Sequence, residues 1–307
     1  MIFIVGPTSS GKTALALKVC KQFGKEIISA DSRQVYKHFD VGTGKVPVNS
    51  LGVHVEKYSG YWTFDGVKIH MYDVCDANSL YTVFDYLNDT KDLIGEGKII
   101  VGGTGLYIDN LLGLKKPSPV PPNLKLRAEL ESKLTSELQQ MLPKEILSSL
   151  NQSDINNPRR LIRKIEMLNF EKSSAVNETK YTGGNNSTTI STPPSNSHIV
   201  ILDLPREELF KRIDFWVDEI WDALIVEINT LINLGYENSI PMKGIIYNKV
   251  LDFVYQKIPT SEAIQFIKND LHAYIRRQQT WFKTYSSNNV HKFPSSESAF
   301  DYIESVM

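Results

Sequence analysis

The chain has 307 residues, of which 41% are hydrophobic and 22% charged, and its formal net charge is −1. This length suits one large core with an appended piece, and the near-neutral charge excludes a protein that binds polyanions through a global basic excess. No apolar run approaches the roughly 20 residues of a membrane span, so we expect no membrane association. Two cysteines, Cys20 and Cys75, cannot form a disulfide framework, and six scattered histidines do not predict a structural zinc site.

The first predicted element is a core strand, Ile2–Val5, which lacks the basic leader and the cleavage site of an export signal. We therefore expect a cytoplasmic protein. The strand leads into "GPTSSGKT", from Gly6 to Thr13, which fits the phosphate-binding pattern G-x-x-x-x-G-K-S/T, and a predicted helix over Lys12–Phe23 follows. The glycines let successive backbone N–H groups point into one concavity, and Lys12 adds a positive charge. The pattern predicts a phosphate site but leaves open which phosphate compound it holds.

Short apolar strands alternate with helices over the first third of the chain. The predicted strands are Glu26–Ser29, Val67–Val74 and Lys98–Val101, and a further helix is predicted over Leu80–Ile94. Alternation of this kind is typical of a parallel sheet wrapped by helices. The predicted fold class is α/β, with a P-loop NTPase-like parallel sheet as its core.

Polar and small residues follow two of these strands. Asp31 and Ser32 come after Glu26–Ser29, and the carboxylate could hold Mg²⁺ in an NTPase, accept a proton in a transferase, or cap a helix. The strand Lys98–Val101 leads into the run Gly102–Gly105, where many ATPases have an acidic pair. Its glycines permit the close approach of a ligand and Thr104 offers an uncharged hydroxyl, although a tight turn would need the same glycines.

The sequence changes character after Leu114, where "KKPSPVPPN" predicts a hinge. Apolar residues at helical spacing then predict helices over Leu124–Leu142 and in "PRRLIRKIEML", before a polar stretch, Lys172–Ser197, that we interpret as a mobile loop. The predicted organisation is a first part of the core at residues 1–116, a mainly helical insertion at 117–197, and completion of the core with C-terminal helices at 198–307. In the last part we predict a strand from His198 and helices over Arg206–Leu234, Ile245–Gln256, Thr260–Tyr285 and Ser295–Val306.

Two basic segments bear on a polyanionic partner. "PRRLIRKIE" places Arg159, Arg160 and Arg163 within about two helical turns, a density that suits phosphate contacts. "YIRRQQTWFK" combines Arg276 and Arg277 with aromatic residues, a mixture that unstacked RNA bases prefer. The alternative is a charged helix face over an aromatic core, which is the commoner fate of tryptophan and phenylalanine.

One string is far more specific than the phosphate loop beside it. "DSRQVYKHFDVGT", which begins at Asp31, does not occur in ordinary P-loop kinases, and with the other motifs it resembles the tRNA dimethylallyltransferases, also called tRNA isopentenyltransferases. The resemblance implies transfer of a dimethylallyl group from dimethylallyl diphosphate to the exocyclic amino group of the adenosine adjacent to the tRNA anticodon. It covers nearly the whole chain in family order, through "GPTSSGKT", "VGGTGLYIDNLL", "PRRLIRKIE", "PREELFKRID" and "RRQQTWFK".

The resemblance also implies roles for individual residues. Asp31 would be the catalytic base and Thr104 a catalytic residue that positions the reacting group, while the insertion would clamp the anticodon stem-loop of a tRNA bound by a monomer. Mg²⁺ would be the cofactor, with Thr13 as its protein ligand. The implied diphosphate-binding residues are Gly6, Thr8, Ser9, Ser10, Gly11, Lys12, Thr13 and Arg212, and the implied tRNA-binding residues are Ser32, Gln34, Arg159, Arg160, Arg163, Arg276 and Arg277.

The sequence departs from the family pattern at four positions. Trp216 stands where a second arginine is frequent, Ile246 replaces a glycine, Asn157 an acidic residue and His272 an arginine. Three alternative functions also stay open, because each would use a phosphate loop. They are an adenylate isopentenyltransferase with the same donor site, a small-molecule kinase that binds ATP, and a non-enzymatic P-loop switch that binds RNA.

Overall fold

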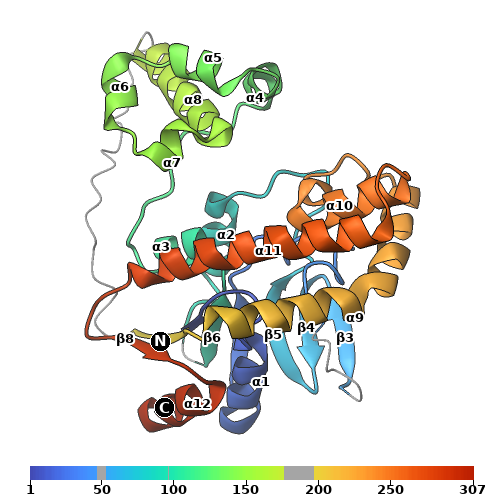
Figure 1. The fold of residues 1–307 in the computed structure, drawn as a ribbon. Helices are drawn as coiled ribbons and strands as arrows, with labels where there is room; N and C mark the ends of the chain where they lie inside the picture. The colour runs from blue at the N-terminus through green and yellow to red at the C-terminus, as the bar shows by residue number, and fades with distance from the viewer. Residues whose placement is uncertain (47–52, 96, 176–196) are drawn as a thin grey trace. The chain divides into compact units, whose positions relative to one another are not determined.

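The computed structural model describes residues 1–46, 53–95, 97–175 and 197–307, without the side chains of 173–175. Within these residues the chain divides into two compact units. The first contains residues 1–115 and the described chain from Ser197 onward, and the second runs from Lys116 through the described helix that ends at Ala175 (Figure 1).

An eight-stranded sheet forms the centre of the first unit, in the order β3-β4-β5-β2-β6-β1-β7-β8. The strands from β5 to β8 in this order are parallel, and β3 and β4 extend the sheet as an antiparallel hairpin (Figure 1). The predicted parallel core is thus confirmed, whereas β3, β4 and β8 were not predicted. The strands are β1 Ile2–Val5, β2 Glu26–Ser29, β3 Val55–Tyr58, β4 Gly60–Phe64, β5 Val67–Tyr72, β6 Lys98–Gly102, β7 His198–Leu202 and β8 Val290–Phe293.

The central strands are apolar on both faces because helices cover the sheet on both sides. In β1, Ile2 and Ile4 belong to one hydrophobic cluster while Phe3 and Val5 belong to another. Successive strand residues point to opposite faces, so a strand buried on both sides needs this continuous apolar run. Because these strands are parallel, their carboxyl ends lie at one edge of the sheet, where the connections to the helices begin.

The predicted helices of the first unit keep their bounds closely, with one shortened helix, and two helices, Gly105–Leu111 and Pro241–Lys243, were not predicted. α2 spans Val83–Thr90 instead of Leu80–Ile94, because Thr82 caps it: the Thr82 hydroxyl accepts from the Asp85 N–H at 3.3 Å, and the Asp85 carboxylate accepts from the Thr82 N–H at 2.8 Å. α9 and α11 pack side by side (Figure 1). The remaining helices are α1 Lys12–Phe23, α3 Gly105–Leu111, α9 Arg206–Asn233, η1 Pro241–Lys243, α10 Ile245–Val254, α11 Thr260–Lys283 and α12 Ser296–Val306.

The second unit is helical, as predicted, but its first predicted helix is two helices. Leu124–Leu142 is wrong as one element because the Glu137 carboxylate accepts from the Leu134 N–H at 2.7 Å, which starts a new helix there. α8 extends into the predicted polar loop as far as Ala175, and the rest of that prediction, residues 176–196, lies outside the described residues. The helices are α4 Leu124–Glu131, α5 Thr135–Gln140, α6 Lys144–Ser149, α7 Gln152–Ile155 and α8 Pro158–Ala175.

Among the described residues of both units, no helix combines the length and the apolar character that crossing a bilayer requires.

Candidate active site

The phosphate loop connects the end of β1 to the start of α1. Gly6 and Gly11 have φ values of 149° and 88°, and a Cβ on Gly6 would lie 2.7 Å from the Leu202 carbonyl oxygen. Both positions therefore require glycine, for the left-handed backbone and, at Gly6, for space. No side chain caps α1 at Gly11, so the first N–H groups of this helix remain directed at the loop concavity. This is the arrangement by which helix N-termini bind phosphates.

Lys12 lies in this concavity. Its ammonium donates to the Pro7 carbonyl at 2.5 Å and lies 3.5 Å from the Ser10 hydroxyl. Burial lowers the pKa of Lys12 from 10.5 to about 8, and the negative charge of Asp31 opposes part of that shift. Lys12 and Asp31 are therefore close enough to interact electrostatically, and a bound anion would favour the charged lysine.

Gln278 links the phosphate loop to the end of β6. Its side-chain oxygen accepts from the Thr8 N–H at 2.8 Å, and its amide nitrogen donates to the Gly103 carbonyl at 2.9 Å. A Cβ on Gly103 would lie 2.4 Å from that nitrogen, so the glycine is needed for the contact. The sequence analysis did not identify Gln278 as a site residue, and its only signal was its place inside the "RRQQTWFK" motif.

Asp31 and Thr104 come together because each follows one of the neighbouring parallel strands β2 and β6. The Thr104 hydroxyl accepts from the Ser32 N–H at 3.1 Å, and the Thr104 N–H donates to the Ala30 carbonyl at 3.2 Å. Asp31 accepts from the Arg33 N–H at 2.8 Å, so the carboxylate does cap its own turn. It also lines the cavity described next, so capping and exposure to a ligand are compatible.

One cavity of about 460 Å³ in the first unit contains both the phosphate loop and Asp31. The polar residues that line it include Ser9, Lys12, Thr13, Asp31 and Gln34. Apolar residues from β2, β5, β6, α9, α10 and α11 also line it. They include Ile27, Ile69, Val101, Ile213, Trp216, Ile245, Ile246 and Leu271.

Gln34 belongs to this cavity but its amide is already engaged within the protein. The Ser29 hydroxyl donates to the Gln34 side-chain oxygen at 2.7 Å, and the Gln34 nitrogen lies 3.3 Å from the Thr43 carbonyl and 3.4 Å from that of Gly44. Gln34 therefore holds the segment around Thr43 against the end of β2.

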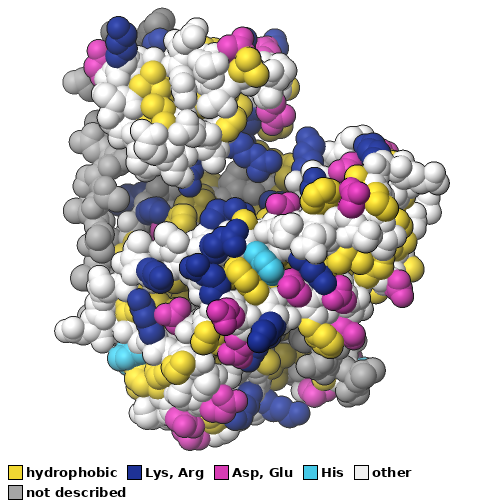
Figure 2. Space-filling view, viewed as in Figure 1, with side chains coloured by type: hydrophobic (Ala, Val, Ile, Leu, Met, Phe, Trp, Pro, Cys, Tyr) yellow, Lys and Arg dark blue, Asp and Glu magenta, His cyan; other side chains and the backbone are white. Residues whose placement is uncertain are grey.

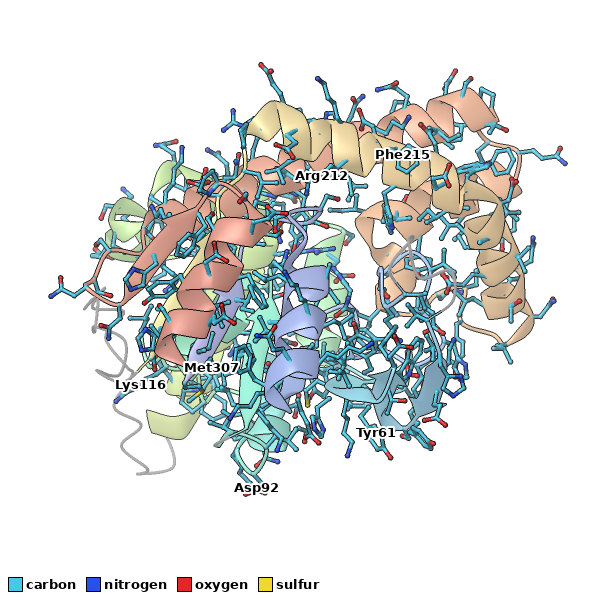
Figure 3. The ribbon with its side chains drawn as sticks, turned by 90° about the horizontal axis from the view of Figure 1, so that it is seen from below. Tyr61, Asp92, Lys116, Arg212, Phe215 and Met307 are labelled. Carbon is cyan, nitrogen blue, oxygen red and sulfur yellow. The ribbon has the colours of Figure 1, made fainter. Side chains whose placement is uncertain are left out.

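Arg212 lies beside the phosphate loop although the residue is far away in sequence. A Cβ on Gly11 would lie 3.9 Å from a terminal nitrogen of Arg212, and Figure 3 shows Arg212 on α9 near the N-terminal end of α1. The guanidinium pairs with Glu208 at 2.5 Å, and 45% of the side chain is exposed. Its position suits contact with an anion in the loop while Glu208 limits its mobility.

Of the predicted RNA-binding residues of the first unit, Ser32 and Gln34 line the cavity, and the two arginines lie on the surface of α11. Arg276 and Arg277 are exposed, and the Arg276 guanidinium lies 5.8 Å from the centre of the Phe210 ring. Figure 2 shows Lys and Arg side chains gathered over the C-terminal half of α11 and the beginning of α9. His272 stacks on Phe210 with ring centres 3.8 Å apart and pairs with Asp214 at 2.7 Å. Aromatic residues further along α11 pack inside the protein, which was the alternative to stacking on RNA bases. Phe282 is buried in the core, and the Trp281 N–H donates to Asp109 at 3.2 Å.

The three predicted arginines of the second unit have different environments. Arg159 is exposed, Arg160 pairs with Asp154, and Arg163 donates to the Val120 carbonyl at 2.6 Å and to Glu166 at 3.1 Å. Most of the Arg163 guanidinium therefore serves the packing of this unit. Asn157, one of the departures from the family pattern, accepts from the Arg160 N–H at 3.3 Å and so caps the start of α8.

A parallel α/β sheet with a phosphate loop and a carboxylate in one cavity defines a class of phosphate-binding enzymes. The model of the family described as IPP transferase matches residues 34–285 of the chain. The chain belongs to the IPP transferase family, which confirms the resemblance seen in its motifs.

Individual relatives agree with this assignment. A tRNA dimethylallyltransferase of Acetivibrio thermocellus is 31% identical over 92% of this chain and 88% of its own length. A tRNA dimethylallyltransferase 2 of Treponema denticola is 32% identical over 94% and 93% of the two chains. The crystal structure of the full-length tRNA isopentenylpyrophosphate transferase of Bacillus halodurans is similar with a TM-score of 0.64 and 25% identity, over 99% of this chain and 95% of that one.

Proposed function

We propose that this protein transfers the dimethylallyl group of dimethylallyl diphosphate to the exocyclic amino group of the adenosine adjacent to a tRNA anticodon. The observation that carries the proposal is the single cavity that contains the phosphate loop, Asp31 and an apolar wall. A diphosphate, a proton acceptor and a hydrocarbon group are what this reaction brings together. The relatives, which are named for the same reaction, support the assignment.

We expect the phosphate loop to bind the diphosphate group of the donor. Negative charge grows on the leaving diphosphate as its oxygen separates from the allylic carbon, and groups that are already oriented toward that charge lower the barrier. The N–H groups at the start of α1, with Lys12 and Arg212, would supply this stabilisation. The prenyl chain would lie against the apolar wall around Ile213 and Trp216.

Mg²⁺ fits the same end of the cavity. The described residues contain no group of three or more His, Cys, Asp or Glu side chains that could hold a metal by themselves. Mg²⁺ is commonly bound through few protein oxygens together with substrate phosphates and water. Thr13, which lines the cavity, would provide a protein oxygen, and the ion when bound would neutralise charge on the diphosphate.

On the acceptor side, we assign Asp31 the role of the base for the adenine amino group. The adenine nitrogen forms the new bond to the allylic carbon, the carbon–oxygen bond to diphosphate breaks, and Asp31 takes the proton that the amino group loses. Thr104, joined to Ser32, would orient the reacting groups, and Gln34 would hold the adjacent wall. The adenine must leave the stack of the anticodon loop to enter the cavity.

RNA contacts would come from exposed arginines of both units. Arg276 and Arg277 on α11 and Arg159 on α8 are the strongest candidates because they are exposed. Arg160 and Arg163 are already engaged with acceptors of their own unit, so we assign them a smaller share of RNA affinity.

Incubation with Mg²⁺, dimethylallyl diphosphate and either unmodified tRNA or AMP tests the proposal. Mass spectrometry of the nucleosides should find isopentenyladenosine in the tRNA and no product from AMP. Prenylation of AMP alone would make the protein an adenylate isopentenyltransferase instead. Phosphorylation of an acceptor by ATP, without prenyl transfer, would make it a kinase.

A further inference from the structure

A short segment outside the sheet forms part of the cavity wall. Gly42, Thr43, Gly44 and Val46 all line the cavity, yet residues 40–46 belong to no strand or helix. A wall without a ladder of backbone hydrogen bonds needs other contacts to keep its place. Besides the contacts of Gln34, three of these come from one carboxylate on α9.

Glu227 accepts hydrogen bonds from three successive backbone N–H groups of this segment. Its carboxylate lies 2.6 Å from the Asp40 nitrogen, 2.7 Å from that of Val41 and 3.2 Å from that of Gly42. Successive N–H groups that converge in this way form a concave anion site. Hydrogen bonds to an ionised acceptor are shorter and stronger than neutral ones.

Tyr247 completes the coordination of Glu227. Its hydroxyl donates to the same carboxylate at 2.7 Å. A Cβ on Gly42 would lie 2.7 Å from an atom of the Tyr247 ring, so the ring packs directly on the segment and no other residue type fits at position 42. Burial, together with the charge of Glu227, raises the pKa of Tyr247 far above its ordinary value and keeps the hydroxyl protonated as a donor.

The same helix, α9, carries other parts of the cavity. Arg212 lies at the phosphate loop and Trp216 lines the cavity, while Glu227 follows about three helical turns further on. One helix thus connects the phosphate loop to the 40–46 segment of the cavity wall. A further fixed point of the segment, beside Gln34, is Lys45, a fully buried ammonium that donates to the Tyr36 carbonyl at 2.7 Å and pairs with Asp40 and Asp73.

We infer that Glu227 is a positioning residue, which holds the 40–46 wall at a fixed place relative to the phosphate loop. The inference on turnover rests on the proposed function, whereas the inference on the wall rests on geometry alone. A displacement of about 1 Å in an active site can reduce the rate on the order of 100-fold. The loss of one acceptor for these four donors would produce such a displacement.

Hydrogen exchange tests the wall directly, without reference to any reaction. In Glu227→Gln the amide presents only one oxygen to the donors, so amides of residues 40–42 should exchange at least tenfold faster than in the wild type. Glu219→Gln, an exposed glutamate on the same helix, is the matched control and should leave exchange unchanged. Unaltered exchange in Glu227→Gln would overturn the inference.

Kinetics test whether the wall matters for the reaction. We expect the single-turnover rate of Glu227→Gln to fall about 10- to 100-fold, while its Kd for inorganic pyrophosphate changes less than about twofold, because the phosphate loop keeps its own contacts. A general loss of structure would weaken both. A normal rate in Glu227→Gln would restrict the residue to a structural role and overturn the positioning claim.

Tyr247→Phe keeps the test valid if Glu227→Gln fails to fold. This variant removes one donor and leaves the three backbone contacts, so it should show smaller changes in the same direction. If the wild type transfers no prenyl group at all, the proposed function fails, and the exchange measurements still decide on Glu227.

Discussion

Asp31 and Lys12 line one cavity, and in the proposed reaction they have opposite tasks. The carboxylate would receive a proton, and the ammonium would bind growing negative charge. Each charge influences the other, since Asp31 opposes the fall in the pKa of Lys12. A change at either residue should therefore affect one step strongly and the other step weakly.

The carboxylate is tested by Asp31→Asn, which keeps the size of the side chain and removes the base. We expect the single-turnover rate to fall about 10²- to 10⁴-fold, the usual contribution of a general base. Pyrophosphate should bind as well as in the wild type or slightly better, because a negative charge near Lys12 is gone. Asp92→Asn is the control, since Asp92 is exposed and lies at the other end of the sheet from Arg212 (Figure 3). A near-normal rate in Asp31→Asn would leave Asp31 only its role as a cap.

The pH dependence of pyrophosphate binding tests whether the Lys12 ammonium contacts the bound anion. Lys12 in the free protein loses its charge as the pH rises through about 8, because burial disfavours the charged form. A bound anion favours that form, so the affinity advantage of the wild type over Lys12→Met should be constant below this pH and should fall above it, by up to about tenfold per pH unit. Titration calorimetry on both proteins measures the ratio, in which the ionisation of pyrophosphate itself cancels. A ratio independent of pH would show that Lys12 does not contact the anion.

At the scale of elements, the end of β6 depends on the absence of side chains. A Cβ on Gly102 would lie 2.2 Å from the carbonyl oxygen of Ala30, which directly follows the neighbouring strand β2, and a backbone atom held beside a central strand cannot move away cheaply. Gly102→Ala should therefore lower the free energy of unfolding by about 1–3 kcal/mol, measured by urea denaturation. In Gly95→Ala the added methyl meets no atom within 4 Å, so this control should be close to neutral. Equal stability of the two variants would contradict the packing argument.

Some parts of the fold and of the site could be predicted from the sequence, and others could not. The strand, glycine turn and helix around Lys12 have a local pattern, and the proximity of Asp31 to the loop follows from neighbouring parallel strands. Glu227 and Gln278 could not be found in this way, since they contact backbone groups 187 and 270 positions away. Gly103 belongs to the run whose glycines predicted a close approach, and Gly42 belongs to the motif that begins at Asp31, but the partner in each case is defined only by the packing of α11 or α10.

Over the whole molecule, positive charge is distributed unevenly although the net charge is −1. Basic side chains gather over α11 and the start of α9, where we expect them to contact RNA phosphates (Figure 2). In Arg276→Gln combined with Arg277→Gln, the slope of log affinity for tRNA against log salt should decrease by about 0.7–0.9 for each lost phosphate contact. Lys91→Gln, an exposed change at the end of α2, should leave the slope unchanged. Pyrophosphate affinity should be the same in all these proteins.

The second unit allows affinity and stability to be separated with two arginines of one helix. Arg159 is exposed, whereas Arg163 donates to Val120 and to Glu166, whose side chain is only 1% exposed. Arg159→Gln should weaken tRNA binding and reduce its salt dependence while the thermal unfolding of the protein stays the same. Arg163→Gln should instead destabilise this unit by about 1–3 kcal/mol, because a buried carboxylate loses a charged donor and keeps only Arg127 and a backbone N–H. Hydrogen exchange in peptides of α4 and α8 measures this loss, and an Arg163→Gln variant with normal exchange but weak tRNA binding would assign Arg163 to the RNA instead.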